Sequence, residues 1–282
     1  MDNLTNIIDD LVTHLSTLRE LGQRKVRLDP QILRDLAVPV KQVSARRQAV
    51  AATPAAAVAA RAVEREALTE ASLRNAPDLP LAERQQELQL LRQSMNHCFD
   101  CALCKNRDAA LDGSGKIDSP DIMVIGPAPD QTDKIAGAVF SGAGGKLFDI
   151  MIDAIGYSRD SIYITNICKC PAPANGKPTI SQMKSCSHFL ESQILCIKPK
   201  IILVMDEHAI KGLFHKDMSA ARAQGQWSNY HGIPVMTTLH PNYVLRFSDD
   251  AEGEQTTLKR SVWSALKTVK KQLARYNQAN SN

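Results

Sequence analysis

The sequence predicts an α/β protein: a three-layer α/β/α sandwich with a central four-stranded parallel sheet, plus a helical N-terminal extension. The first reason is that four short runs of apolar residues alternate with segments whose apolar residues recur at helical spacing. The second is size. The chain has 282 residues, of which 44% are hydrophobic, which is enough for one domain of about 100–200 residues and an appendage.

The N-terminal segment, residues 1–43, is predicted to be helical. Residues 4–21 carry leucine and isoleucine at the spacing of one helix face, which is typical of an amphipathic helix. An apolar stripe of this kind packs against the main domain, against a second copy of the chain, or against a partner protein. The sequence leaves these three alternatives open.

Residues 44–80 differ in composition from the segments on either side. They are rich in alanine, contain three prolines and lack aromatic residues. This composition is typical of a linker that is partly helical and partly disordered. The main domain is therefore expected over residues 81–276.

The main domain is predicted to contain four strands separated by helices. The strands are short apolar runs bounded by turn residues, at residues 121–126, 161–165, 200–205 and 234–238. The helices show apolar residues at intervals of three and four, at residues 81–95, 146–155, 180–197, 207–214 and 255–276. Because helices intervene between the strands, we expect a parallel, twisted sheet with helices on both faces.

Charge and composition exclude several classes of protein. A net charge of +4 is too small for a strongly basic coat protein, although a local basic patch remains open. No apolar run reaches the roughly 18 residues that a membrane span needs, and the N-terminus carries acids where a signal peptide has bases. We therefore expect a cytoplasmic protein, in which seven cysteines indicate metal binding or free thiols over disulfides.

Polar side chains follow three of the predicted strands. Asp130, Asn166 and His240 each come at or just after the C-terminal end of a strand. In a parallel sheet these ends meet at one edge, where ligands usually bind. A lone histidine is more often structural, but three polar groups at three strand ends predict a functional site.

The glycine-rich run at residues 141–146 is not a nucleotide-triphosphate loop. That motif needs glycine at position 140 and serine or threonine at 147, which are Phe140 and Leu147 here. The glycines are expected to allow close backbone approach at a helix N-terminus. Such a place suits a nucleic-acid phosphate.

Four cysteines form two pairs that suit a metal. Cys98 and Cys101 are separated by two residues, so one tight turn presents both thiolates. Cys170 and Cys186 are separated by a loop and helical turns, a spacing wider than zinc knuckles use, which favours a 4Fe-4S cluster with zinc as the alternative. Buried free cysteines are the structural alternative for this quartet. That interpretation is preferred for the remaining cysteines, Cys104, Cys168 and Cys196.

Four motifs follow one another through the main domain. The first two are Cys98-x2-Cys101-x-Leu103 with Arg107, and the segment 126–147 with Ala128-Pro129, Gly137, Phe140, Gly142 and Gly145. The last two are Thr165-Asn166-x2-Lys169-Cys170, continued by Asn175, Pro178 and Cys186, and His240-Pro241-x-Tyr243-x-Leu245-Arg246. With these motifs, residues 98 to about 273 resemble the type-4 uracil-DNA glycosylases, the iron–sulfur branch of the uracil-DNA glycosylase superfamily.

The resemblance implies a DNA-repair enzyme, expected to be monomeric, that flips uracil out of DNA and hydrolyses its N-glycosidic bond. Phe140 would stack on the flipped base, Asn166 would distinguish uracil from cytosine, and His240 would stabilise the leaving base. Arg246 would hold a phosphate. The implied substrate-binding residues are Phe140, Asn166, Ala128, Asn175, His240 and Arg246. The implied ligands of the 4Fe-4S cluster are Cys98, Cys101, Cys170 and Cys186.

The first active-site motif departs from the family pattern. The family typically reads Gly-Glu-Ala-Pro-Gly where residues 126–130 read Gly-Pro-Ala-Pro-Asp. The acid is missing at Pro127, Asp130 replaces a glycine, and Asp133 falls where the family often has glutamate; Pro171 also replaces a usual arginine. Either Asp130 takes over the positioning of water in an active enzyme with altered base preference, or the protein is a catalytically altered or inactive member that binds nucleic acid without cutting uracil. A third alternative is a zinc-stabilised α/β protein with an unrelated partner.

Overall fold

The computed structural model describes residues 78–173, 177–215, 224–247 and 254–279, with the side chains of the last segment described from residue 256. All of these residues belong to one compact unit, Val58–Asn282. The predicted helical segment 1–43 and nearly all of the predicted linker 44–80 lie outside the described residues.

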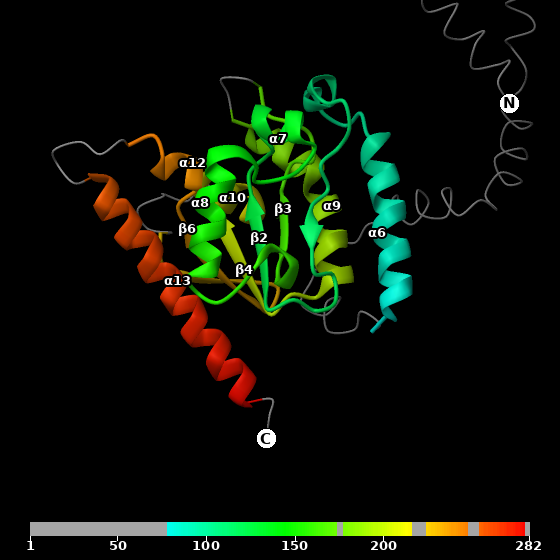
Figure 1. Ribbon diagram of the computed structural model, residues 1–282. Helices are drawn as coiled ribbons and strands as arrows, with labels where there is room; N and C mark the ends of the chain where they lie inside the picture. The colour runs from blue at the N-terminus through cyan, green and yellow to red at the C-terminus, as the bar shows by residue number, and fades with distance from the viewer. Residues whose placement is uncertain (1–77, 174–176, 216–223, 248–253, 280–282) are drawn as a thin grey trace, which may run out of the picture. The chain divides into compact units, whose positions relative to one another are not determined.

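A six-stranded mixed sheet forms the centre of the described residues (Figure 1). The strands are β1 Ser114–Gly115, β2 Ile122–Gly126, β3 Tyr163–Asn166, β4 Ile201–Met205, β5 Trp227–Tyr230 and β6 Ile233–Thr238. Their order is β1-β3-β2-β4-β6-β5. The pairs from β3 to β6 are parallel, whereas β1 and β5 pair antiparallel with their neighbours at the two edges.

The prediction of a four-stranded, purely parallel sheet is therefore wrong in strand number and direction, although the four predicted strands are the four parallel ones. The two strands that were missed are short edge strands. β1 has two exposed residues, and β5 has only one buried side chain, Tyr230. Neither shows an apolar run, because an edge strand needs little burial and is kept polar against unwanted pairing.

Seven helices and two 3-10 turns surround the sheet in the described residues. The helices are α6 Leu81–Asn96, α7 Gln131–Ala136, α8 Gly142–Asp153, α9 Ile180–Ile197, α10 Glu207–Phe214, α12 Pro241–Val244 and α13 Glu254–Ala279, and the turns are η1 Ala102–Asn106 and η2 Arg159–Ser161. The sequence missed α7 and α12, which are too short to show a helical period. The sequence analysis placed the start of α8 at residue 146. In the structure α8 begins at Gly142, and the glycines that were expected to precede the helix form its first turn.

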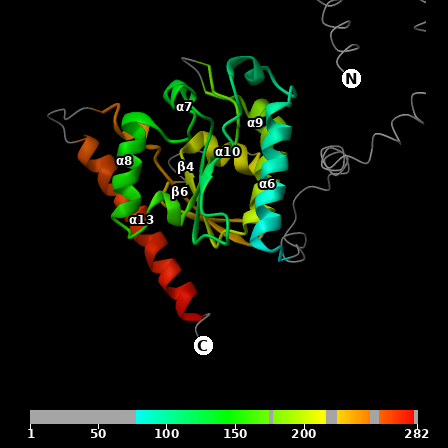
Figure 2. The ribbon, with the colours of Figure 1, turned by 45° about the vertical axis from the view of Figure 1, so that its right-hand side comes forward.

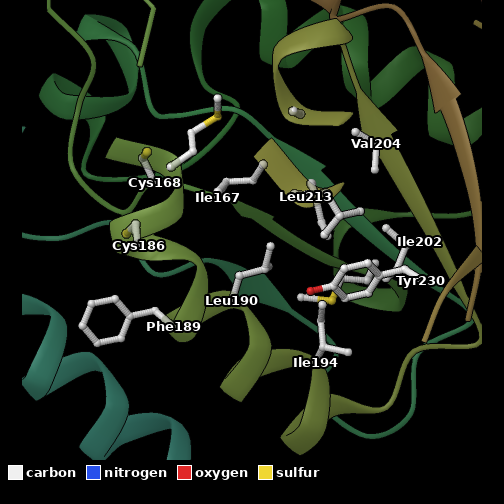
Figure 3. Close-up of a cluster of buried hydrophobic side chains, with 14 of the residues drawn as sticks. Ile167, Cys168, Cys186, Phe189, Leu190, Ile194, Ile202, Val204, Leu213 and Tyr230 are labelled. Atoms are coloured by element: carbon white, nitrogen blue, oxygen red, sulfur yellow. The ribbon is translucent and has the colours of Figure 1, made fainter. Parts of the chain in front are cut away.

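The helices pack in two layers, one on each face of the sheet (Figures 1 and 2). Successive side chains of a strand point to opposite faces, so Met123 joins a core with α6, α9 and α10, whereas Val124 joins a core with α8 and α13. Figure 3 shows part of the first core, where Ile194 and Leu190 of α9 face Ile202 of β4. The three-layer arrangement is thus as predicted. No helix in the described residues is both long and apolar enough to cross a membrane.

The two-layer packing predicts different effects for two isoleucines on α8. Ile152 is 2% exposed and Ile150 is 67% exposed. We expect Ile152→Ala to lower the free energy of unfolding by about 2–5 kcal/mol, because it leaves a cavity in the core. Ile150→Ala should change it by less than about 0.5 kcal/mol. Urea denaturation followed by circular dichroism measures both, and equal losses would contradict the orientation of α8.

Candidate active site

A pocket opens where the parallel strands end, beside α7 and α12. We call it the strand-end pocket. The predicted site residues in its lining are Ala128, Asp130, Asp133, Phe140, His240 and Arg246. The lining also contains residues that the sequence analysis did not select, among them Lys177, Asp206 and Asn242. The predicted substrate-binding residue Asn175 lies outside the described residues.

Phe140 and Asn166 meet against Gly126 at the end of β2. A Cβ atom on Gly126 would lie 2.3 Å from Asn166 Oδ1 and 3.0 Å from Phe140 Cζ, so only glycine fits there. Phe140 has a left-handed backbone (φ 54°), which is rare for a bulky residue and concentrates at functional sites. Its ring stacks on that of His240, with centroids 5.1 Å apart.

Asn166 is the last residue of β3 and is almost fully buried, with 1% of its surface exposed. It does not line the strand-end pocket directly. Its Nδ2 atom is buried without a hydrogen-bond partner among the described residues. An unsatisfied buried amide costs about 1–3 kcal/mol, and the carboxamide is therefore well suited to a ligand that offers an oxygen.

His240 begins α12 as its N-cap. Its Nδ1 accepts a hydrogen bond from the backbone N–H of Asn242, at 3.2 Å. The neutral ring therefore carries its proton on Nε2, where it is available as a donor. Burial lowers the pKa of His240, against the opposing charges of Asp206 and Asp130, so the imidazole is neutral at pH 7.

Asp130 and Asp133 hold α7 in place. Asp130 Oδ1 accepts from the backbone N–H of Asp133 at 2.9 Å, and its Oδ2 accepts from Asn242 Nδ2 at 2.8 Å. Asp133 accepts from the backbone N–H groups of Ser141, at 2.6 Å, and Asp130, at 3.2 Å. Burial raises the pKa of Asp133. All four oxygens are thus engaged, and the link from Asp130 to Asn242 joins the first motif to the last.

Asp206 and Lys177 add a charged pair to the pocket. Asp206 directly follows β4 and caps α10, and its Oδ2 lies 3.7 Å from Lys177 Nζ. The sequence carried a usable signal for Asp206, since it is a polar residue at a strand end like Asn166. Arg246 lies at the pocket and is exposed.

A second pocket, the cysteine pocket, brings the two predicted cysteine pairs together. Its lining contains Cys98, Cys101, Cys170 and Cys186, and also Cys104, which the sequence analysis had set apart. Thiolates are ligands of both zinc and iron–sulfur clusters, so the donor set fits either group. In the described residues no group of three or more His, Cys, Asp or Glu side chains is arranged to hold a metal ion.

The surroundings of the cysteine pocket act on its thiols in opposite directions. Burial raises the pKa of Cys98, Cys101 and Cys170. Arg107 Nη1 donates to Cys170 Sγ at 3.0 Å. A hydrogen bond from Cys168 lowers the pKa of Cys186, and the nearby ammonium of Lys169 acts in the same direction. Cys168 lies beside Cys186 within the core (Figure 3). Cys196 lies elsewhere, against the carbonyl of Arg84.

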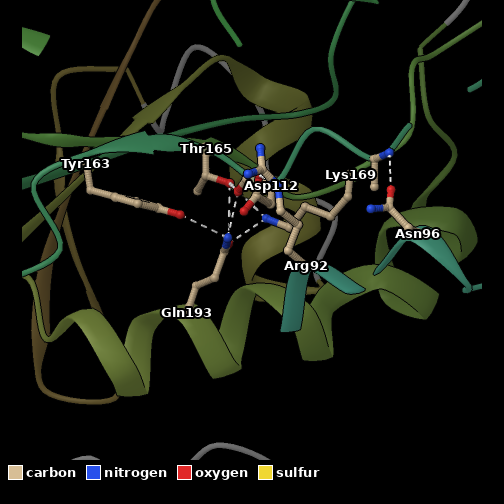
Figure 4. Close-up of polar contacts among 8 residues, drawn as sticks. Arg92, Asn96, Asp112, Tyr163, Thr165, Lys169 and Gln193 are labelled. Carbon is tan, nitrogen blue, oxygen red and sulfur yellow. Dashed lines mark hydrogen bonds and ion pairs between the residues drawn. The ribbon is translucent and has the colours of Figure 1, made fainter. Parts of the chain in front are cut away.

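Lys169 connects the cysteine pocket to Asn166. Its side chain is fully buried, and Nζ donates to Thr165 Oγ1 at 2.8 Å, to the Asn166 carbonyl at 2.5 Å and to Gln193 Oε1 at 2.7 Å. Figure 4 shows this network, in which Gln193 also donates to the Asp112 carbonyl. Burial lowers the pKa of Lys169 to about 8.

Comparisons with known proteins point to one family. A family model described as the Uracil DNA glycosylase superfamily matches residues 113–267. The chain is similar to the type-4 uracil-DNA glycosylase of Saccharolobus solfataricus, with 36% identity over 167 residues, which cover 56% of this chain and 77% of the relative. It is also similar to the type-4 uracil-DNA glycosylases of Thermotoga maritima, with 30% identity over 58% of this chain and 85% of the relative, and of Archaeoglobus fulgidus, with 32% identity over 55% and 81%.

The extent of these matches decides the family. The family model covers more than half of the chain, and the relatives are matched over more than two thirds of their length. The chain therefore belongs to the uracil-DNA glycosylase superfamily and, within it, to the type-4 uracil-DNA glycosylases.

Proposed function

We propose that this protein excises uracil from DNA by hydrolysing the N-glycosidic bond, which leaves an abasic site for base excision repair. The observation that carries the proposal is the strand-end pocket, where His240 presents an Nε2–H donor beside the ring of Phe140. The names of the similar proteins support the same activity. They do not favour a binding module without catalysis.

The base is read after it leaves the DNA stack. Flipping costs a few kcal/mol and brings the base within reach of the pocket. Phe140 stacks on it, which contributes about 1–3 kcal/mol. Asn166 accepts a hydrogen bond from uracil N3–H and donates to O4 through the Nδ2 that lacks a partner. Cytosine presents the opposite pattern, so the carboxamide discriminates against it.

The bond breaks with the electron pair leaving on the base. The neutral imidazole of His240 donates from Nε2 to the uracil oxygen that gains negative charge, in the manner of an oxyanion hole. A water molecule adds to C1′ of the sugar and loses a proton. Arg246 and the exposed start of α8 contact the DNA phosphates.

Cys98, Cys101, Cys170 and Cys186 would hold a 4Fe-4S cluster, with zinc as the alternative. The donor set of the cysteine pocket and the family membership support this proposal. Such a group would join residues 98–107 to the loop and helix that carry Cys170 and Cys186, and its contribution is structural. No step of the hydrolysis requires it.

The first test uses an oligonucleotide with a single uracil, followed by alkali to break the strand at abasic sites. The wild-type protein should cleave at the uracil, and Asn166→Ala and His240→Ala should each lower the single-turnover rate at least about 100-fold. Matched controls in the β5–β6 hairpin, Asn229→Ala and His231→Asn, should retain the rate. Wild-type rates in both pocket variants would refute the proposed roles.

The cluster proposal is tested by composition. The purified protein should be brown and contain iron and acid-labile sulfide. Cys170→Ser should lose most of both, whereas Cys196→Ser should keep them, because Cys196 lies outside the cysteine pocket. A colourless protein that contains zinc would show that the cysteines hold zinc and not a 4Fe-4S cluster.

The neutral state of His240 should be visible in protein stability. Its pKa in the folded protein lies below 6.5, so the unfolded chain takes up the proton first as the pH falls. The stabilisation is therefore complete above pH 6.5 and is lost progressively below it, toward the folded pKa. Urea denaturation at pH 7.5 and about pH 5.5 should show a smaller loss for His240→Asn than for wild type. An equal loss in wild type and in His240→Asn would contradict a neutral His240.

A further inference from the structure

Asp206 occupies the central position among the strand ends. In the parallel pairing of β2 with β4, Ile125 lies opposite Val204, and the residues two positions further on, Pro127 and Asp206, both line the strand-end pocket. On the other side, the Asp206 N–H donates to the Thr238 carbonyl at 2.9 Å. Asp206, after β4, therefore lies between Pro127, where the family's usual acid is missing, and the end of β6, which His240 follows.

The backbone of Asp206 is strained. Its φ of 92° and ψ of 169° fall in a region that is essentially restricted to glycine. Its Oδ1 caps α10 by accepting from the N–H groups of His208, at 2.8 Å, and Ala209, at 3.0 Å. Helix capping does not require this conformation, because N-cap residues normally have negative φ. The strain therefore points to a second role for the side chain.

The second oxygen of Asp206 remains available in the pocket. Its Oδ2 lies 3.7 Å from Lys177 Nζ and accepts no hydrogen bond from the described residues. Among the described residues, three carboxylates line the strand-end pocket. The other two, Asp130 and Asp133, have both oxygens engaged in hydrogen bonds. The side chain of Asp206 is only 16% exposed, which limits competition from bulk water.

We propose that Asp206 is the catalytic carboxylate of this glycosylase and replaces the acid that is absent at Pro127. The inference rests on the proposed uracil excision. As the bond between C1′ and N1 breaks, its electron pair leaves with uracil. The Oδ2 atom of Asp206 orients a water molecule, whose oxygen bonds to C1′ of the sugar. The water's proton passes to Oδ2 and then to solvent, where the uracil anion takes up an equivalent proton.

The proposal gives Asp206 the role that the sequence had suggested for Asp130. Asp130 instead links α7 to Asn242. Asp206 also differs from a simple capping residue, since a cap needs only one oxygen and no charge. A neutral asparagine keeps a capping oxygen and has the shape of aspartate, so it meets the same backbone strain without the charge. Asp206→Asn therefore separates the two roles.

The first experiment measures single-turnover excision and binding of uracil-containing DNA for wild type and Asp206→Asn. We expect the rate to fall about 100-fold or more, with the dissociation constant for DNA unchanged within about threefold and cooperative melting retained. The control is Glu207→Gln, which neutralises the next carboxylate on α10, outside the pocket lining. It should keep the wild-type rate.

A second variant, Asp206→Gly, relieves the backbone strain and leaves space for a small carboxylate. Added sodium formate should raise its rate several-fold and should leave the rates of wild type and Asn166→Ala unchanged. A structural cap would show no such rescue, so the absence of acceleration would overturn the catalytic role.

The remaining outcomes are also decisive. A wild-type rate in Asp206→Asn overturns the inference while the glycosylase function stands. A slow Asp206→Asn that also melts early or loses DNA binding identifies Asp206 as structural. A wild-type protein that yields no abasic product overturns the proposed function, and the inference falls with it.

Discussion

The buried ammonium of Lys169 is the interaction on which the rest of the site depends. It lies where the end of β3, helix α9 and the cysteine-bearing loop meet, and its three donor bonds are directed to Thr165, Asn166 and Gln193. A buried charge is tolerated only when it is well hydrogen-bonded. Because one of its acceptors is the main chain of Asn166, the same side chain anchors the residue proposed to read the base and the loop that carries Cys168 and Cys170.

A second connection orders the other side of the pocket. Asp130 accepts a hydrogen bond from the side-chain amide of Asn242. The backbone N–H of Asn242 in turn donates to His240 Nδ1 and so fixes the tautomer of His240. The loop after β2 therefore controls the orientation of the loop after β6. Preorganised donors of this kind lose no free energy to reorientation when charge develops on a substrate. The pocket is thus assembled from segments more than 100 residues apart in the sequence.

Much of this arrangement could be predicted from the sequence, because the parallel strands and the long helices carry strong periodic patterns. Helices α9 and α10 begin and end at the predicted residues. The edge strands β1 and β5 could not be predicted, since they bury too little to show an apolar pattern. At the site, Asp130 was identified by its position, but its hydrogen bonds to Asp133 and Asn242 depend on the packing of α7 and α12. Asp206 also carried a usable signal, its place directly after β4, but its positive φ could not be read from the sequence.

Gly144 has a consequence for how this protein can change over evolution. A methyl group at this position would lie 1.8 Å from Asn242 Oδ1. Any larger residue at 144 would displace Asn242, and the displaced amide would release Asp130. Drift at one of these three positions is therefore constrained by the other two. A lineage that exchanges Asn242 for a smaller residue removes the clash at Gly144 but leaves Asp130 as the cap of α7, so the coupling is tightest between Gly144 and Asn242.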